Sequence, residues 1–130
     1  MKTELASLVW ISAFTGLLWV PYVLNRMTVL GIGPTVGYPS DPPPLAPWAR
    51  RLRLAHANAV ENLVMFAALV LAAQIQGVSS PATAAAATLY LWSRIVHAVS
   101  YTLGVPWVRT LAFVGGFAAQ MILAWQLVTT

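Results

Sequence analysis

The stretch RRLRLAHANAVEN, residues 50–62, leads without a break into the apolar run from Leu63 to Ala73. The two segments together are long enough to form a helix that enters a membrane. A carboxylate inside a membrane is costly to desolvate, so Glu61 is expected to have a partner or a ligand. This stretch therefore predicts a membrane helix that carries a polar site.

The composition places the rest of the chain in the same environment. The 130 residues are 59% hydrophobic and 8% charged and include no cysteine, and the mean hydropathy is +0.75. These values predict an integral membrane protein of one domain, residues 1–130. Without cysteine there is no disulfide, thiolate nucleophile or Cys-ligated metal. The net charge of +4 comes mostly from arginines near predicted membrane boundaries, so nucleic acid is not an expected partner.

Four apolar segments predict an all-α fold, with helices at residues 5–25, 48–76, 81–103 and 107–128. The first segment is longer than the core of a signal peptide and no small-x-small cleavage site follows it. We therefore expect it to be retained, with Pro21 loosening its last turn.

Dense Gly and Pro between residues 27 and 47 predict a connector without helix. Ser80 and Pro81 suit the start of the third helix. Short links on either side of that helix predict an up-down four-helix bundle.

The placement of arginine predicts the orientation. Arg26, Arg50, Arg51 and Arg53 flank the first loop, and Arg109 lies beside the third. By the positive-inside rule, the first and third loops are expected to be cytoplasmic. Lys2 is the only basic residue that argues for the opposite orientation.

Polar residues on the second predicted helix fall on neighbouring stripes. Asn58, Glu61 and Asn62 lie at i, i+3 and i+4, and Arg53 lies two turns before Glu61. Because these residues recur at helical spacing, their side chains are expected to gather on one side of the helix.

The third predicted helix has a matching polar face, formed by Arg94, His97 and Tyr101. An arginine and a glutamate at similar depth on adjacent helices are expected to form an ion pair or to share a charged ligand. Polar side chains can also hold membrane helices together, but so many polar groups exceed what helix packing requires, which favours a ligand site. No metal is expected, because no H-E-x-x-H motif occurs and the arginines would repel a cation.

The segment from residue 51 to 62, the motif Arg94-x-x-His97-x-x-x-Tyr101 and the segment Pro106-x-x-Arg109-Thr110 resemble the MAPEG family, the membrane-associated proteins in eicosanoid and glutathione metabolism. The resemblance runs along the whole chain and suggests a prokaryotic-type member. It implies a homotrimer in the bacterial inner membrane that binds glutathione as co-substrate between neighbouring subunits, toward the cytoplasmic face.

The resemblance also implies roles for individual residues. Arg109 is the expected catalytic residue, because an arginine near the glutathione thiol would stabilise the thiolate. The resemblance and the helix stripes together give the expected glutathione contacts: Arg26, Arg53, His56, Asn58, Glu61, Asn62, Arg94, His97, Tyr101 and Thr110. Leu54 and Ala59 stand where the family commonly has Arg and Asp.

Three functions fit these patterns. The leading hypothesis is a membrane glutathione transferase or peroxidase-like enzyme acting on lipophilic electrophiles. The second is a non-enzymatic trimeric protein that binds another anionic or lipid ligand or serves as a scaffold. The third is a small four-helix drug exporter, against which the arginines around Glu61 argue, since such exporters use a glutamate that cations can reach.

Overall fold

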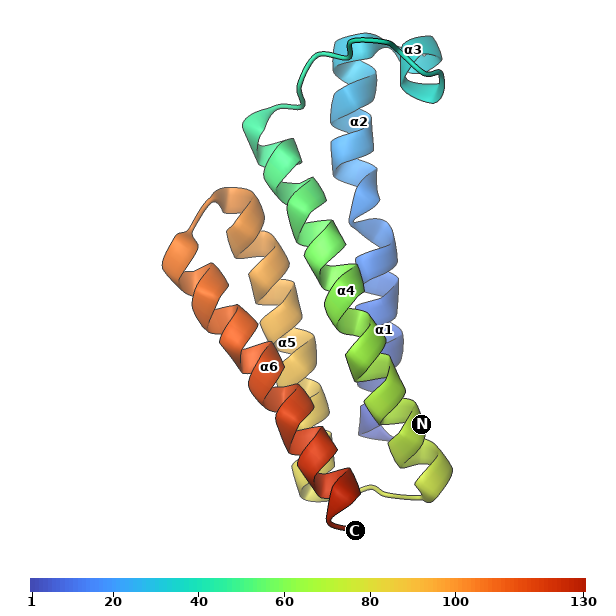
Figure 1. The fold of residues 1–130 in the computed structure, drawn as a ribbon, viewed down its shortest axis with the longest axis vertical. Helices are drawn as coiled ribbons and strands as arrows, with labels where there is room; N and C mark the ends of the chain where they lie inside the picture. The colour runs from blue at the N-terminus through green and yellow to red at the C-terminus, as the bar shows by residue number, and fades with distance from the viewer.

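The computed structural model describes all 130 residues, and every regular element in it is a helix. The elements are α1 (Thr3–Leu17), α2 (Trp19–Leu30), α3 (Ile32–Val36), α4 (Pro47–Gln76), α5 (Pro81–Leu103) and α6 (Pro106–Val128). Figure 1 shows α1 and α2 following one another as a single long rod, with α4, α5 and α6 running beside it. The chain is therefore all-helical, as the sequence predicts.

Three segments are long and apolar enough to cross a membrane: Thr3–Leu30, Pro47–Gln76 and Pro106–Val128. The remaining long helix, α5, is not among them, because Arg94, His97 and several Ser and Thr residues reduce its hydropathy. It packs chiefly against α6 and also contacts α1 and α4. A fourth crossing by α5 stays a prediction.

The first rod differs from the sequence prediction in two ways. Helix α2 extends to Leu30, beyond the predicted end at residue 25, and a short break at Leu18 separates it from α1. Pro21 explains the position of the break, because it has no N–H to donate to the carbonyl of Leu17, four residues earlier. The loosening therefore falls one turn before the proline rather than at the end of the helix.

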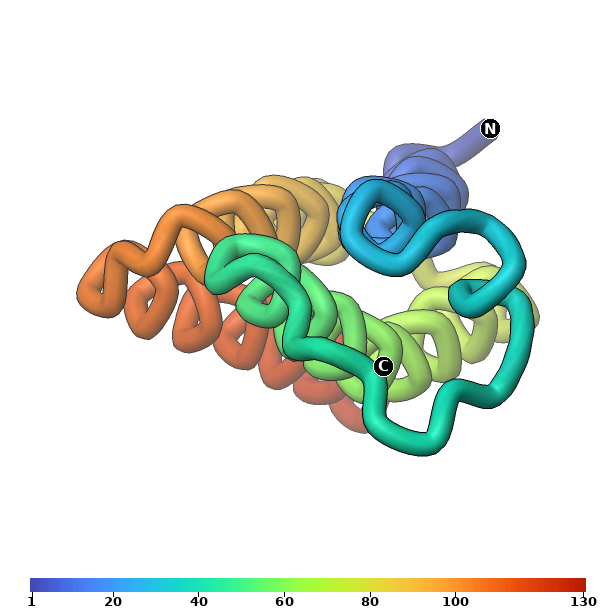
Figure 2. Tube along the Cα trace, turned by 90° about the horizontal axis from the view of Figure 1, so that it is seen from above, coloured from blue at the N-terminus to red at the C-terminus, as the bar shows by residue number.

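The first loop also contains a helix where the sequence predicts none. Helix α3 includes Gly33 and Pro34. Both lie in its first turn, where the backbone N–H groups have no helical acceptor, so a proline there removes no hydrogen bond. Seen from above, the loop then crosses from α2 to the start of α4 (Figure 2).

Two tight turns join the long helices, and both use the same local chemistry. Gly77 and Gly104 end α4 and α5 with φ of 71° and 75°, in the left-handed region that favours glycine. After each glycine comes a proline at the first position of the next helix. Ser80 caps α5 as predicted, its Oγ accepting a hydrogen bond from the Thr83 N–H at 3.2 Å. These turns make α4, α5 and α6 successive antiparallel neighbours (Figure 1).

The core lies between these helices and uses small residues to bring them close. Phe66 of α4 stacks on Tyr90 of α5, with ring centroids 3.8 Å apart. Buried alanines surround this pair, including Ala86, Ala87 and Ala119. Most other large apolar side chains are exposed on the outside of the chain, including Trp10, Trp92 and Trp125. Such a surface suits lipid or another protein subunit rather than water.

Candidate functional site

Buried polar groups meet where α4, α5 and α6 come together. The Arg94 side chain, only 2% exposed, donates a hydrogen bond from Nη2 to Asn58 Oδ1 at 2.6 Å. Asn62 donates to the Asn58 carbonyl at 2.9 Å, and Gln120 Nε2 donates to the Asn62 carbonyl at 3.0 Å. This set, the α4–α5 polar network, contains three of the predicted site residues. Gln120 was not predicted, because a single glutamine in α6 has no helical repeat to mark it.

Two adjacent glycines on α6 make room for the polar face of α5. A Cβ added at Gly116 would lie 3.2 Å from Arg94 Cδ, and one added at Gly115 would lie 2.6 Å from Ser93 Oγ. With a larger residue at either position, the Ser93 or Arg94 side chain would have to move or α6 would have to shift away from α5. The Gly115-Gly116 pair is thus a close-packing point that allows Arg94 to be buried beside α6.

A second polar group lies closer to the α5–α6 turn. The Arg109 guanidinium sits over the Tyr101 ring, 5.1 Å from its centroid, which is a cation–π geometry. His97 lies edge-on to Tyr101 at 5.6 Å between centroids and is tilted against Phe113 at 6.0 Å. We call these four residues the Arg109 cluster. His97 is 3% exposed and its Nδ1 has no hydrogen-bond partner, so this ring keeps an unused polar atom.

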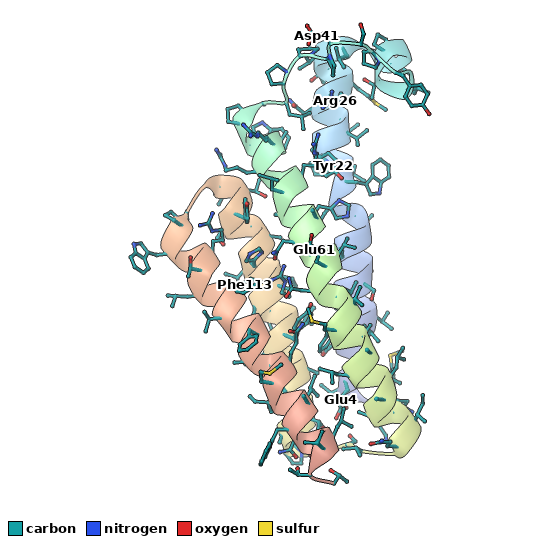
Figure 3. All side chains as sticks on the ribbon, viewed as in Figure 1. Glu4, Tyr22, Arg26, Asp41, Glu61 and Phe113 are labelled. Atoms are coloured by element: carbon teal, nitrogen blue, oxygen red, sulfur yellow. The ribbon has the colours of Figure 1, made fainter.

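Glu61 and Arg94 form no ion pair within the single chain, so a shared charged ligand is the expectation that stays open for them. Glu61 is exposed and has no side-chain partner, whereas Arg94 bonds to Asn58. Glu61 lies about 60° around α4 from Asn58, which places it on a face that no other helix covers. Figure 3 shows it partway along α4, well away from both helix ends. A carboxylate at this position requires a ligand or a partner from outside the chain.

His56 takes part in a different contact. Its Nδ1 is 2.8 Å from the Tyr22 hydroxyl, which joins α4 to α2. Tyr22 was not predicted; the signal was available, because a tyrosine hydroxyl within an apolar helix needs a hydrogen-bond partner. Thr110 is exposed, and its hydroxyl donates to the Pro106 carbonyl within its own helix at 2.9 Å. The structure therefore does not join His56 and Thr110 to the α4–α5 polar network.

Arg26 and Arg53 share a pocket with Arg50 beside the first loop. The pocket has a volume of about 310 Å³ and is completed by Pro42, Pro43, Pro44, Leu45 and Leu54. We call it the three-arginine pocket. No interaction links it to Arg94 or Arg109, so the predicted site residues do not form a single cluster within one chain. Arg50 was missing from the predicted contacts.

Two further features lie away from these groups. Near the N-terminus, Glu4 is buried and accepts hydrogen bonds from Thr83 at 2.5 Å and Ser79 at 3.0 Å, which fixes α1 to the start of α5.

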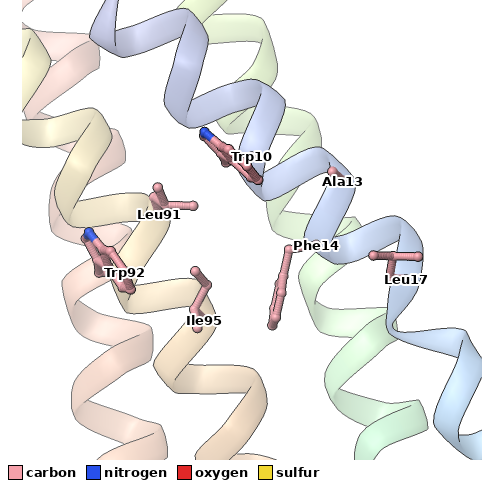
Figure 4. A pocket seen from close by; sticks show the side chains of 7 residues that line it. All are labelled: Trp10, Ala13, Phe14, Leu17, Leu91, Trp92 and Ile95. Carbon is pink, nitrogen blue, oxygen red and sulfur yellow. The ribbon is translucent and has the colours of Figure 1, made fainter.

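The largest cavity, about 430 Å³, lies between α1 and α5 and has only apolar walls, including Trp10, Phe14 and Trp92 (Figure 4). No group of His, Asp and Glu residues is arranged to hold a metal ion.

Comparison with known proteins gives one positive result. Among models of protein families, that of the MAPEG family matches residues 8–129. No curated protein and no solved structure matches the chain significantly. The matched range includes the α4–α5 polar network, the Arg109 cluster and the three-arginine pocket.

Proposed function

Because the chain belongs to the MAPEG family, we propose that it is a prokaryotic-type membrane glutathione transferase or peroxidase-like enzyme that acts on lipophilic electrophiles. Three apolar helices and the family membership make it a membrane protein of the glutathione and eicosanoid group. In conjugation, the thiol loses its proton, the thiolate sulfur bonds to the electrophilic carbon, and the leaving group departs with the bonding electrons. The protein has to favour the thiolate.

The Arg109 cluster is the observation that supports this proposal best. Arg109 is half-buried, and its guanidinium is held in position by the Tyr101 ring. The guanidinium forms no ion pair or hydrogen bond within the chain, so its N–H donors are available to a ligand. A fixed cation of this kind stabilises a thiolate through donors that need no rearrangement when the charge forms.

Other residues supply the complementary charges of glutathione, which has two carboxylates and one ammonium. Glu61, which lacks a partner in the chain, would accept the ammonium. Arg94, buried against Asn58, would attract a carboxylate through its charge rather than by direct contact. His97, Asn62, His56 and Thr110 are further candidate contacts. Arg26 and Arg53 were also expected to contact glutathione, but they belong to a different pocket, and the proposal does not depend on them.

We propose a homotrimer in the bacterial inner membrane, with the first and third loops in the cytoplasm. The uncovered face of α4 supports assembly, because Glu61 on this face would otherwise meet lipid. The distribution of arginine supports the orientation. A neighbouring subunit would then complete the site, as the resemblance implies.

The test is turnover of a lipophilic electrophile, with glutathione, by purified wild-type protein and Arg109 variants. We expect Arg109→Ala to reduce turnover by about 10²–10³, the range for removing one preorganised donor. Arg109→Lys should be intermediate, because it keeps the charge but loses the planar set of donors. Ultraviolet absorbance of the bound thiolate, measured against pH, should show a higher thiol pKa in the alanine variant. Unchanged turnover and an unchanged thiol pKa would mean that Arg109 only marks the membrane boundary.

The second candidate, a non-enzymatic protein that binds an anionic or lipid ligand, is favoured by a specific observation. The arginines of the three-arginine pocket have no acidic partner in the chain. Binding of another anionic or lipid ligand, with neither glutathione binding nor turnover of any electrophile, would support this alternative.

A further inference from the structure

The three-arginine pocket carries positive charge that no ion pair within the chain neutralises. Arg26 comes from α2, and Arg50 and Arg53 come from the first two turns of α4. No carboxylate lines the pocket, and none of these side chains makes a hydrogen bond or ion pair within the chain. Three guanidinium groups around one cavity repel one another, so the arrangement favours an anionic ligand.

The pocket lies at the boundary of the predicted membrane spans. Arg26 is near the end of the span Thr3–Leu30, and Arg50 and Arg53 are near the start of the span Pro47–Gln76. Figure 3 shows Arg26 close to the first loop, far from Glu4 at the opposite end. Trp48, which is 40% exposed, lies at the same level, as tryptophans do at membrane interfaces. Lipid headgroups occupy this depth.

The remaining walls suit the part of a lipid next to its phosphate. Pro42, Pro43 and Pro44 provide a stiff surface without N–H donors, and Leu54, which is 47% exposed, extends the apolar surface along α4. Arginines on one side and apolar walls on the other match an anion attached to a hydrophobic chain. The pocket is also fixed in shape, because Asn25 Oδ1 accepts a hydrogen bond from the Ala46 N–H at 3.1 Å and holds the loop against α2.

From this geometry we propose that the three-arginine pocket binds the phosphate of an anionic phospholipid. Planar guanidinium groups bind phosphate oxygens through paired hydrogen bonds. A lipid whose headgroup has no positive charge is preferred, because an ammonium or choline group would be repelled by the third arginine. The inference goes beyond the proposed enzyme function and assigns Arg26, Arg50 and Arg53 to a lipid rather than to glutathione.

The test is native mass spectrometry of the full chain in detergent, titrated with phosphatidylglycerol, phosphatidylcholine or inorganic phosphate. We expect phosphatidylglycerol to bind more tightly than phosphatidylcholine, and inorganic phosphate to bind weakly because it leaves the apolar walls unused. Each basic residue near an anionic lipid contributes about fivefold to affinity. The double variant Arg50→Gln, Arg53→Gln should therefore bind phosphatidylglycerol about 25-fold more weakly.

Arg51→Gln is the matched control. It removes one charge from the same turn of α4, but Arg51 is outside the pocket and donates to the Thr102 carbonyl at 2.9 Å. We expect at most a twofold effect. The variant Arg50→Lys, Arg53→Lys keeps the charge and should lose less affinity than the glutamine pair, so a folding defect in the latter does not decide the result.

Four outcomes would overturn the proposal. Three of them are equal losses in the Arg51 control and the double variant, equal affinity for the two lipids, and phosphate binding as tight as lipid binding. The fourth is displacement of phosphatidylglycerol by glutathione, because the arginines would then belong to the peptide site. Thiolate formation at Arg109 is measured separately, so failure of the lipid proposal leaves the enzyme proposal standing.

Discussion

Replacing Asn58 with alanine should destabilise the protein through Arg94. Asn58 Oδ1, at 2.6 Å, is the only hydrogen-bond acceptor that the Arg94 side chain has in the chain. The Arg94 Nε is buried and already has no partner, and the side chain is 2% exposed, so water cannot replace the lost acceptor. A hydrogen bond to a charged group typically contributes about 1.5–3 kcal/mol. We expect Asn58→Ala to lower the free energy of unfolding by about that amount.

The assay is unfolding of the purified protein in mixed detergent micelles with increasing SDS, followed by tryptophan fluorescence. Asn58→Asp should be far less destabilising, because it keeps the acceptor and provides Arg94 with a carboxylate. Thr110→Val is a control, since Thr110 is exposed and bonds only within its own helix. Adding Arg94→Met to Asn58→Ala should recover part of the stability, because the unpaired charge is removed while an unbranched chain still packs beside Gly116.

Two results would refute this reasoning. The first is an Asn58→Ala variant as stable as Thr110→Val, which would show that Arg94 has another acceptor, for example from a second subunit. The second is a failure of Arg94→Met to recover any stability in the Asn58→Ala background. The cost of the alanine would then come from lost packing on α4 rather than from a buried charge without a partner.

Two further predictions concern positions where the structure offers clear controls. Glu61→Gln should weaken glutathione binding measured by titration calorimetry but leave SDS unfolding nearly unchanged, because Glu61 has no partner within the chain; a large stability loss with unaltered affinity would contradict this. Gly115→Ala should cost about 1–3 kcal/mol of unfolding free energy, because its Cβ would lie 2.6 Å from Ser93 Oγ, so that either the buried Ser93 side chain or α6 would have to move. Gly16→Ala is the matched control, since nothing lies within 4 Å of the added Cβ and alanine favours the helix; similar stabilities for the two variants would show that α5 and α6 are not tightly packed there.

Much of the secondary structure could be predicted because its signals are local. Apolar runs of membrane length gave the long helices, and the Gly–Pro pairs at residues 77–81 and 104–106 gave the turns between them. The first loop was less well predicted. The density of Gly and Pro in this loop predicts no helix, although Pro34 in the first turn of α3 removes no hydrogen bond.

The candidate site could be predicted only in part. Helical spacing correctly placed Asn58 near Asn62 and Arg94 near His97, because residues three or four apart share a helix face. It did not reveal Gln120 or Tyr22, which are isolated polar residues whose partners come from other helices. Arg50 was overlooked as a ligand contact because its position next to Arg26 depends on how the first loop folds back.

The sequence by itself determined that this is an all-helical membrane chain with most of its arginines at one end, because length, hydropathy and charge act on each segment separately. Only the tertiary structure decided which polar groups meet. Arg94 bonds to Asn58 and not to Glu61, although both α4 residues lie within one turn of each other. The physical reason is that packing sets the rotation of each helix about its own axis, and a difference of about 60° is enough to bury one side chain against α5 and leave the other on an uncovered face.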